Sequence, residues 1–290
     1  MLRDFKLYSE LATRTVFLSQ LTGTGLMRIK MDAHPWIRCG AEPMVTLNVL
    51  ELWTRISSNP DRAIKAGIYP LAIDSATRAY IQQIIEFMGP DAPALCHKQP
   101  HAFLYLTALG KLFFKAKFIH VIRDGRGAVS SSLSRRLCLG KPEQCLLQWQ
   151  SITTTMIQDC AKLGPNRCIH VRYESLVQHT EQEMRRVLDF LGIPWDPIVL
   201  RHEKIIDQLT GLNPYEPSTK QFLLAVHNKS LDAWARPSSP IPLEVQKKTC
   251  RDLELLQLLN YCPSKGYLPQ YKTIPWDIPK LKEIQSFVPK

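Results

Sequence analysis

The segment AKFIHVIRDGRGAVSSSLSRR, residues 116–136, decides which fold this sequence adopts. Bulky apolar side chains fill most of 118–122, which is typical of a buried strand in a parallel sheet. The strand ends in the charged residues Arg123 and Asp124, and Gly125 then permits a sharp turn. The segment therefore predicts a strand that leads directly into a helix.

The predicted helix of this segment, over 126–137, offers a site for an anion. Its first turn presents unpaired N–H groups and the positive end of the helix dipole. Ser131 and Arg135 lie four residues apart, so they share one face and can offer a hydroxyl and a cation to one ligand. We expect a phosphate here. The alternative is a solvated helix start that carries ordinary surface arginines.

Hydrophobic periodicity predicts an alternation of strands and helices along the chain. The further helices are expected over 43–57, 73–88, 101–113, 142–163, 180–192 and 241–261, and the strands over 15–19, 94–97, 118–122 and 168–173. This alternation is typical of βαβ units. It predicts an α/β protein with a central parallel sheet flanked by helices, whose ligands bind at the carboxyl ends of the strands.

The size of the chain fits one domain. With 290 residues and 45% hydrophobic composition, residues 1–290 can bury a single core. Residues 211–242 are rich in Pro, Ser, Asn and Gly, which indicates an irregular segment that could act as a lid. The proline-rich residues 266–290 are expected to form a C-terminal surface tail.

The charge of the chain favours an anionic partner. The formal net charge is +11, but Lys and Arg are scattered, so a small phosphorylated molecule or an acidic protein segment fits better than DNA. The Cys and His spacings match no zinc site, and we expect neither a metal nor a nucleic acid. No run of about 18 apolar residues is present, so we expect no membrane-spanning helix.

A loop of small residues follows the first predicted strand. Thr22, Gly23, Thr24 and Gly25 would let backbone N–H groups approach an anion closely. The loop lacks the lysine that a nucleoside triphosphatase needs, which makes that class of enzyme an unlikely match.

Three further side chains stand near the ends of predicted strands or the starts of predicted helices. Glu42 precedes Pro43, which suits the first turn of the next helix, so Glu42 is either a helix-start carboxylate or a general base. Lys98 follows the strand 94–97 and could stabilise charge on a leaving group or remain solvated. Tyr173 ends another strand, where its ring could stack on a base or pack in the core.

Taken together, these residues resemble the protein-tyrosine sulfotransferases over roughly residues 15–265. The matching segments are LMRIKMDAHPWIRCGAE (26–42), LCHKQP (95–100), AKFIHVIRDGRGAVSSSLSRR (116–136), CAKLGPNRCIHVRYESLV (160–177) and FLGIPWD (190–196). The resemblance implies the P-loop-like sulfotransferase fold and a homodimeric enzyme of the Golgi lumen. Such an enzyme transfers a sulfuryl group from 3′-phosphoadenosine 5′-phosphosulfate to tyrosine in acidic segments of secretory or membrane proteins.

The resemblance assigns roles in catalysis. A phenol with a pKa near 10 needs a base at neutral pH, and Glu42 matches that base. Lys98 matches the residue that stabilises the departing oxygen. Ser218 and Thr219 match a hydroxyl pair of the lid that reaches the sulfonate donor.

The resemblance also assigns the residues that bind the donor. Arg123 and Ser131 match the grip on the 3′-phosphate, to which Arg135 can add, and Tyr173 matches a nucleotide contact. The loop from Thr22 to Gly25 matches the loop that binds the 5′-sulfonate.

The cysteines allow two interpretations. Composition alone favours free thiols and disulfides about equally, but the resemblance implies two disulfides in an oxidising compartment, Cys39 with Cys96 and Cys160 with Cys168. It leaves open the state of Cys138, Cys145, Cys250 and Cys262. The sequon Asn228-Lys229-Ser230 is compatible with a secreted glycoprotein.

The sequence departs from the family at several functional positions. The loop that reads Pro-Arg-Ser-Gly-Thr-Thr in the family carries Leu21 and Gly25 in place of the arginine and one threonine, and Ala233 replaces a lysine of the lid. Met44 and Asn48 replace two arginines that would meet acidic substrate side chains. The resemblance implies an N-terminal membrane anchor in the family, and we expect no counterpart of it within residues 1–290.

These departures leave two alternatives to an active protein-tyrosine sulfotransferase. One is a binding module that keeps the nucleotide pocket without turnover, and the other is a sulfotransferase for a carbohydrate or small molecule. Retention of Glu42 and Lys98 favours catalysis, because a pure binder needs neither.

The loop substitution yields a direct prediction. Because Leu21→Arg restores a cation at the 5′-sulfonate, we expect the rate of sulfuryl transfer to rise by about 100- to 1000-fold. Transfer of labelled sulfate from the donor to a tyrosine peptide measures the rate, with Leu21→Met as the apolar control. Equal rates for the two variants would contradict the role assigned to this position.

Overall fold

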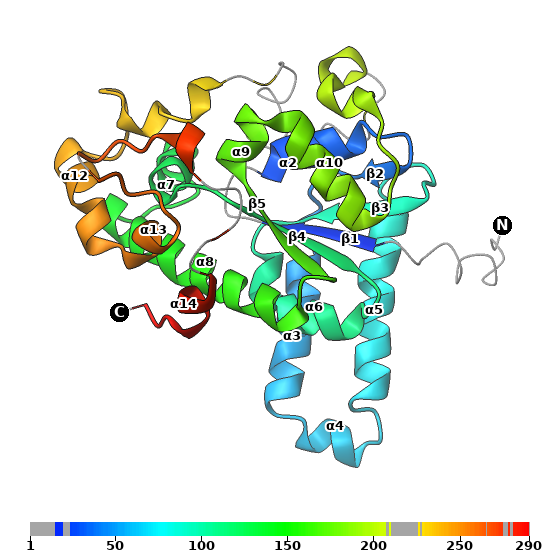
Figure 1. Ribbon diagram of the computed structural model, residues 1–290. Helices are drawn as coiled ribbons and strands as arrows, with labels where there is room; N and C mark the ends of the chain where they lie inside the picture. Colours follow the sequence, from blue (N-terminus) through cyan, green and yellow to red (C-terminus); the bar gives the residue numbers. More distant parts are fainter. Residues whose placement is uncertain are drawn as a thin grey trace.

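The computed structural model describes residues 15–19, 24–206, 209, 226, 228–264, 266–274, 278 and 281–289. Its centre is a five-stranded parallel sheet in the order β2-β3-β1-β4-β5 (Figure 1). The strands are β1 (Thr15–Ser19), β2 (Ile37–Cys39), β3 (Ala94–Lys98), β4 (Lys117–Ile122) and β5 (Cys168–Arg172). The α/β class and the central parallel sheet predicted from the sequence are therefore confirmed.

Helices connect and cover these strands. They are α2 (Thr24–Asp32), α3 (Thr46–Ser58), α4 (Asp61–Lys65), α5 (Leu71–Glu86), α6 (Leu106–Leu112), α7 (Gly125–Ser134), α8 (Pro142–Leu163), α9 (Tyr173–Gln178), α10 (Thr180–Leu191), α12 (Leu243–Asp252), α13 (Glu254–Leu258) and α14 (Leu281–Ser286). Short 3-10 helices are η1 (Ala102–Tyr105), η2 (Pro197–Leu200), η3 (His202–Lys204), η5 (Asn228–Ser230), η6 (Ala233–Ala235) and η7 (Tyr271–Thr273). The helices α3, α4 and α5 extend away from the sheet (Figure 1).

Alternation along the strands sends apolar side chains to both faces of the sheet. In β4, Ile119 and Val121 pack in one cluster with α2, α9 and α10. Phe118 points the other way and packs with η1, α6 and α8. Figure 1 shows these two helical layers on opposite sides of the sheet. A strand that is covered on both faces explains why 118–122 is almost continuously apolar.

A third cluster lies beside the sheet and includes the C-terminal residues. Ile284 of α14 is fully buried and Ile278 nearly so, together with Ile122 at the end of β4. In this cluster Gly125, the first residue of α7, is needed for close packing, because a Cβ there would lie 2.5 Å from the ring of Trp149. The expected surface tail thus contributes to the core instead of only covering it.

Several element boundaries differ from the prediction. Strand β2 was not predicted, because three residues are too few for a periodicity. The expected helix over 43–57 begins only at Thr46, so Pro43 does not lie in its first turn. The expected helix over 241–261 divides into α12 and α13, because Leu253 has extended backbone angles. Helices α4 and α9, each one or two turns long, were not expected either.

All eight cysteines form disulfides. The two pairs implied by the resemblance, Cys39–Cys96 and Cys160–Cys168, are present. The four cysteines left open form Cys138–Cys145, which joins the segment after α7 to α8, and Cys250–Cys262, which joins α12 to the segment after α13.

Two further sequence expectations concern absences and domain limits. Within the described residues, no helix combines the length and apolar character needed to span a membrane. Most of the expected lid lies outside the described residues, and its described part, 228–242, contains η5 and η6. That residues 1–290 form one domain stays a prediction.

Candidate active site

The carboxyl ends of β2 and β3 bring a lysine and a glutamate together. Because the two strands are parallel, Cys39 stands opposite Cys96, and a disulfide joins them. Glu42 follows three residues after the first cysteine and Lys98 two residues after the second. The Lys98 Nζ lies 2.6 Å from the Glu42 Oε2, and their side chains are only 4% and 14% exposed. Such shielding from water strengthens the attraction between the two charges.

Hydrogen bonds to residues at the end of β3 fix the loop that carries Glu42. The N–H of Met44 donates to the Gln99 Oε1 over 3.0 Å, and the Thr46 hydroxyl lies 3.1 Å from the His97 Nε2. Gly40 has no room for a side chain, because a Cβ would lie 2.5 Å from Met88. The expectation that Glu42 begins a helix is wrong, because α3 starts four residues later and the carboxylate pairs with a lysine instead.

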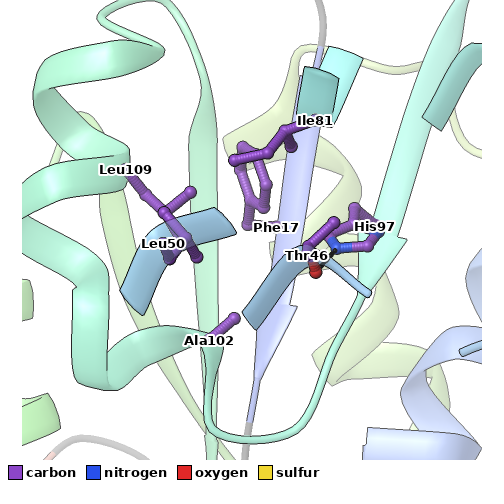
Figure 2. Close-up of a pocket in the computed structure, with 7 residues that line it drawn as sticks. All are labelled: Phe17, Thr46, Leu50, Ile81, His97, Ala102 and Leu109. Atoms are coloured by element: carbon purple, nitrogen blue, oxygen red, sulfur yellow. Dashed lines mark hydrogen bonds between the residues drawn. The ribbon is translucent and has the colours of Figure 1, made fainter. Parts of the chain in front are cut away.

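A mostly apolar pocket lies beside Thr46, the first residue of α3 (Figure 2). It is lined by Phe17, Thr46, Leu50, Ile81, His97, Ala102 and Leu109. Burial, assisted by the neighbouring Lys98 charge, lowers the pKa of His97 to about 4. The imidazole is therefore neutral at physiological pH, and its contact with Thr46 ties the start of α3 to β3. The pocket belongs to the core that supports the site.

Buried polar side chains of 26–39 brace the short strand β2. The Arg28 Nε donates to the carbonyl of Cys39 over 3.0 Å, and the N–H of Cys39 donates to the Asp32 Oδ1 over 2.6 Å. Arg38 donates to three carbonyl groups at the end of α5, those of Ile85, Glu86 and Gly89, where a cation also meets the negative end of the helix dipole. These contacts fix the strand that precedes Glu42.

A second cluster lies at the ends of β4 and β5. The Arg123 guanidinium carbon stands 4.5 Å from the centre of the Tyr173 ring, and both residues are at most 9% exposed. Arg123 lies along α7, because a Cβ at Gly127 would be 3.1 Å from its Nε. Residues 127, 131 and 135 follow one another at intervals of four. Ser131 and Arg135 therefore lie on the same face of α7 as Gly127, which is the face along which Arg123 lies.

The charges in this cluster favour an anionic ligand. Burial lowers the pKa of Arg135, and the positive charge of Arg123 lowers it further, whereas Tyr173 acts in the opposite direction. The effect of Arg123 on Arg135 indicates that the two cations lie close enough to repel each other. A phosphate bound between them would relieve this repulsion and accept hydrogen bonds from both.

The start of α7 itself is not the anion site that the sequence predicted. Asp124 caps the helix, and its Oδ1 accepts the N–H of Arg126 over 2.9 Å. The Arg126 Nη2 lies 2.7 Å from the Asp124 Oδ2, and both side chains are at most 1% exposed. The chain's own carboxylate thus occupies the positive end of the helix, so an anion is expected beside the helix, at Arg123, Ser131 and Arg135.

This buried ion pair joins a network that the sequence did not reveal. Tyr271 donates to the Asp124 Oδ2 over 3.0 Å, and the N–H of Asp124 donates to the Glu174 Oε1 over 3.0 Å. Tyr261 donates to the Glu174 Oε2 over 2.8 Å. Burial, the largest influence, raises the pKa of Glu174, whereas the hydrogen bond from Asp124 opposes the rise. The network ties α7 and α9 to the C-terminal residues.

All these groups meet one edge of the sheet. Since every strand is parallel, the carboxyl ends follow the strand order: Glu42 after β2, Lys98 on β3, the start of α2 after β1, Arg123 after β4 and Tyr173 after β5. The chain reverses its strand order around β1, where open α/β sheets bind their ligands. The Glu42–Lys98 pair and the Arg123 cluster therefore lie on opposite sides of this point.

Other predicted site residues are placed as follows. Thr24 and Gly25 form the first turn of α2 and are buried. Met44 is 53% exposed and Asn48, on α3, is exposed as well, whereas Ala233 begins η6. Leu21, Thr22, Gly23, Ser218 and Thr219 lie outside the described residues. In the described part of the chain, no group of His, Cys, Asp or Glu is suited to hold a metal ion.

Known proteins with similar sequences share a family. The profile of a family described as "Sulfotransferase family" matches residues 20–197. The chain is 38% identical to protein-tyrosine sulfotransferase 1 of Danio rerio over 252 residues, which is 83% of this chain and 70% of that protein. It is 38% identical to protein-tyrosine sulfotransferase 1 of Homo sapiens, covering 83% and 67%, and 35% identical to protein-tyrosine sulfotransferase A of Caenorhabditis elegans, covering 84% and 65%.

Solved structures support the same fold. The sulfotransferase domain of the Synechococcus PCC 7002 olefin synthase superposes with a TM-score of 0.52 at 19% identity, covering 84% of this chain and 94% of that one. Mouse sulfotransferase SULT7A1 complexed with PAP gives a TM-score of 0.50 at 11% identity, covering 84% and 85%. At these identities the likeness concerns the fold alone.

The buried network generates a stability prediction. Arg126→Met leaves the Asp124 carboxylate buried without its partner, so we expect the free energy of unfolding to fall by about 3 to 5 kcal/mol. Arg251→Met is the matched control, because it removes an equally short ion pair to Asp252 at the surface, and it should change stability very little. Urea unfolding measures both. Equal losses of unfolding free energy in the two variants would show that the buried pair stabilises the protein no more than the surface pair does.

Proposed function

Because the chain belongs to the protein-tyrosine sulfotransferase family, we propose that this edge of the sheet transfers a sulfuryl group to the phenolic oxygen of a protein tyrosine. The donor is 3′-phosphoadenosine 5′-phosphosulfate. The observation that carries the proposal is the shielded Lys98–Glu42 pair, 2.6 Å apart, on the same edge as a cationic cluster suited to a phosphate. A protein that only binds the nucleotide has no need of such a pair.

The donor would extend along the edge from β1 towards β5. Its 3′-phosphate fits Arg123, Ser131 and Arg135, because one buried cation, one half-buried cation and a hydroxyl can share a dianion. Tyr173, directly after β5, provides an aromatic face for the nucleotide. The 5′ end would then reach the start of α2, at Thr24 and Gly25, and the neighbouring Lys98 on β3.

In the proposed reaction, Glu42 and Lys98 act on the two oxygens between which the sulfuryl group passes. The phenolic oxygen bonds to sulfur while the bond from sulfur to the bridging phosphate oxygen breaks, and the phenol proton passes to Glu42. Lys98 stabilises the negative charge on the departing oxygen. The products are tyrosine O-sulfate and adenosine 3′,5′-bisphosphate. The hydroxyl pair Ser218 and Thr219 stays a prediction for the contact with the sulfonate.

The biological setting is also part of the proposal. Four disulfides that use every cysteine favour an oxidising compartment, which fits the secretory pathway and, by resemblance, the Golgi lumen. The resemblance likewise suggests a homodimer and substrates with acidic residues around the tyrosine, for which the net charge of +11 gives general support. Asn228 is exposed, as a glycosylated sequon requires.

Variants of the pair test the proposal. Glu42→Gln should lower transfer by about 100- to 10,000-fold, because the phenol loses its base, and Lys98→Met by about 100- to 1000-fold. Transfer of labelled sulfate to a tyrosine peptide measures both. Titration calorimetry with adenosine 3′,5′-bisphosphate should give unchanged affinity for Glu42→Gln, whereas Lys98→Met should bind more weakly, because the departing oxygen that Lys98 stabilises belongs to the 5′-phosphate of this product. Glu51→Gln, at an exposed position of α3, is the control for Glu42→Gln.

The alternative of a binding module predicts another pattern. Leu21 favours it, because it stands in the sequence where the family has a donor-binding arginine. Wild-type protein that binds the bisphosphate but transfers no sulfate would support that alternative. Transfer by Glu42→Gln at the wild-type rate would remove the glutamate from the mechanism.

A further inference from the structure

Ser230 links the described end of the lid to the predicted phosphate site. It is the last residue of η5, and its carbonyl accepts a hydrogen bond of 3.0 Å from the Arg123 Nη2. Its hydroxyl lies 2.9 Å from the Tyr173 hydroxyl. One residue of the lid therefore touches both Arg123 and Tyr173, the two residues that stack on each other.

The segment around Ser230 is anchored on both sides of the contact. Leu231 is 7% exposed and packs in the same cluster as Tyr173. Trp234 is 1% exposed, its Nε1 donates to the Tyr271 hydroxyl over 2.8 Å, and the Arg126 guanidinium carbon lies 4.3 Å from its ring centre. Because its neighbours are fixed, Ser230 can hold its partners in defined orientations.

The chemistry of Arg123 makes this orientation valuable. A guanidinium carries its N–H donors in a planar fork, so fixing the plane fixes the direction of every donor. The Tyr173 ring supports the face of the fork, and the Ser230 carbonyl takes one of its donors. A site that is ordered before the ligand arrives loses less freedom on binding.

We propose that Ser230 is a positioning residue for the 3′-phosphate of the donor, acting through Tyr173 and Arg123. The inference rests on the proposed function, because it takes Arg123 as the phosphate ligand. Ala233, three residues after Ser230, replaces a lysine of the family. The contacts of Ser230 explain how this end of the lid stays connected to the pocket without that lysine. Ser230 should therefore govern how well the protein distinguishes nucleotides with a 3′-phosphate from those without one.

Nucleotide binding tests the proposal most directly. Ser230→Ala removes the hydroxyl contact, so we expect the affinity for adenosine 3′,5′-bisphosphate to fall about five-fold, as for one lost hydrogen bond. The affinity for adenosine 5′-monophosphate should change less than about two-fold, because that nucleotide lacks the 3′-phosphate. Titration calorimetry measures both, and Ser230→Thr, which keeps a hydroxyl, should restore binding.

Two comparisons separate positioning from a general structural effect. Tyr173→Phe removes the other hydroxyl of the same contact, so combining it with Ser230→Ala should weaken binding no more than either change alone. Ser230→Ala also destroys the sequon, and Asn228→Gln, which destroys only the sequon, should bind like the wild type. In turnover, Ser230→Ala should raise the KM for the donor and leave kcat unchanged.

The outcomes that overturn the proposal are distinct from those that overturn the function. Wild-type affinity in Ser230→Ala, equal losses for both nucleotides, or additive losses with Tyr173→Phe would each overturn the positioning role while transfer by the wild type continues. Wild-type protein that binds neither nucleotide would overturn the proposed function, and the positioning role with it.

Discussion

The site depends on the covalent and hydrogen-bonded joint between β2 and β3. Strand β2 has only three residues, so its ladder alone gives little resistance to fraying. The Cys39–Cys96 disulfide, the Asp32 carboxylate on the N–H of Cys39 and the Arg28 guanidinium on its carbonyl hold the strand in register. Because Glu42 follows this joint by three residues, its approach to Lys98 depends on it.

From this joint the chemistry extends along one edge of the sheet. The proposed acceptor side lies at β2 and β3, and the proposed nucleotide side at β4 and β5, with β1 between them. The two sides are held by different means. A disulfide fixes the first, whereas the buried Asp124–Arg126 pair and the tyrosines of the C-terminal residues fix α7 in the second.

Local sequence patterns predicted much of this arrangement. Helix α8 has the predicted ends, and β1, β3, β4 and β5 agree within one residue, because long apolar periods and strand-end charges are local signals. Contacts between distant residues had no such signal. Glu42 meets Lys98 across 56 residues, Arg123 meets Ser230 across 107, and the fully buried Arg126 looked like a surface arginine. Residue chemistry alone had indicated Glu42 and Lys98 separately as candidates, and only the resemblance assigned both to one site.

Removal of the Cys39–Cys96 disulfide tests whether the bonded pairing of β2 with β3 positions Glu42 and Lys98 for catalysis. The measurement is the turnover of sulfuryl transfer by the Cys39→Ala, Cys96→Ala double variant, beside its affinity for adenosine 3′,5′-bisphosphate. We expect turnover to fall at least about ten-fold, since small displacements of catalytic groups are costly, while binding at the distant β4–β5 side persists. Wild-type turnover in a variant that binds normally would contradict this expectation.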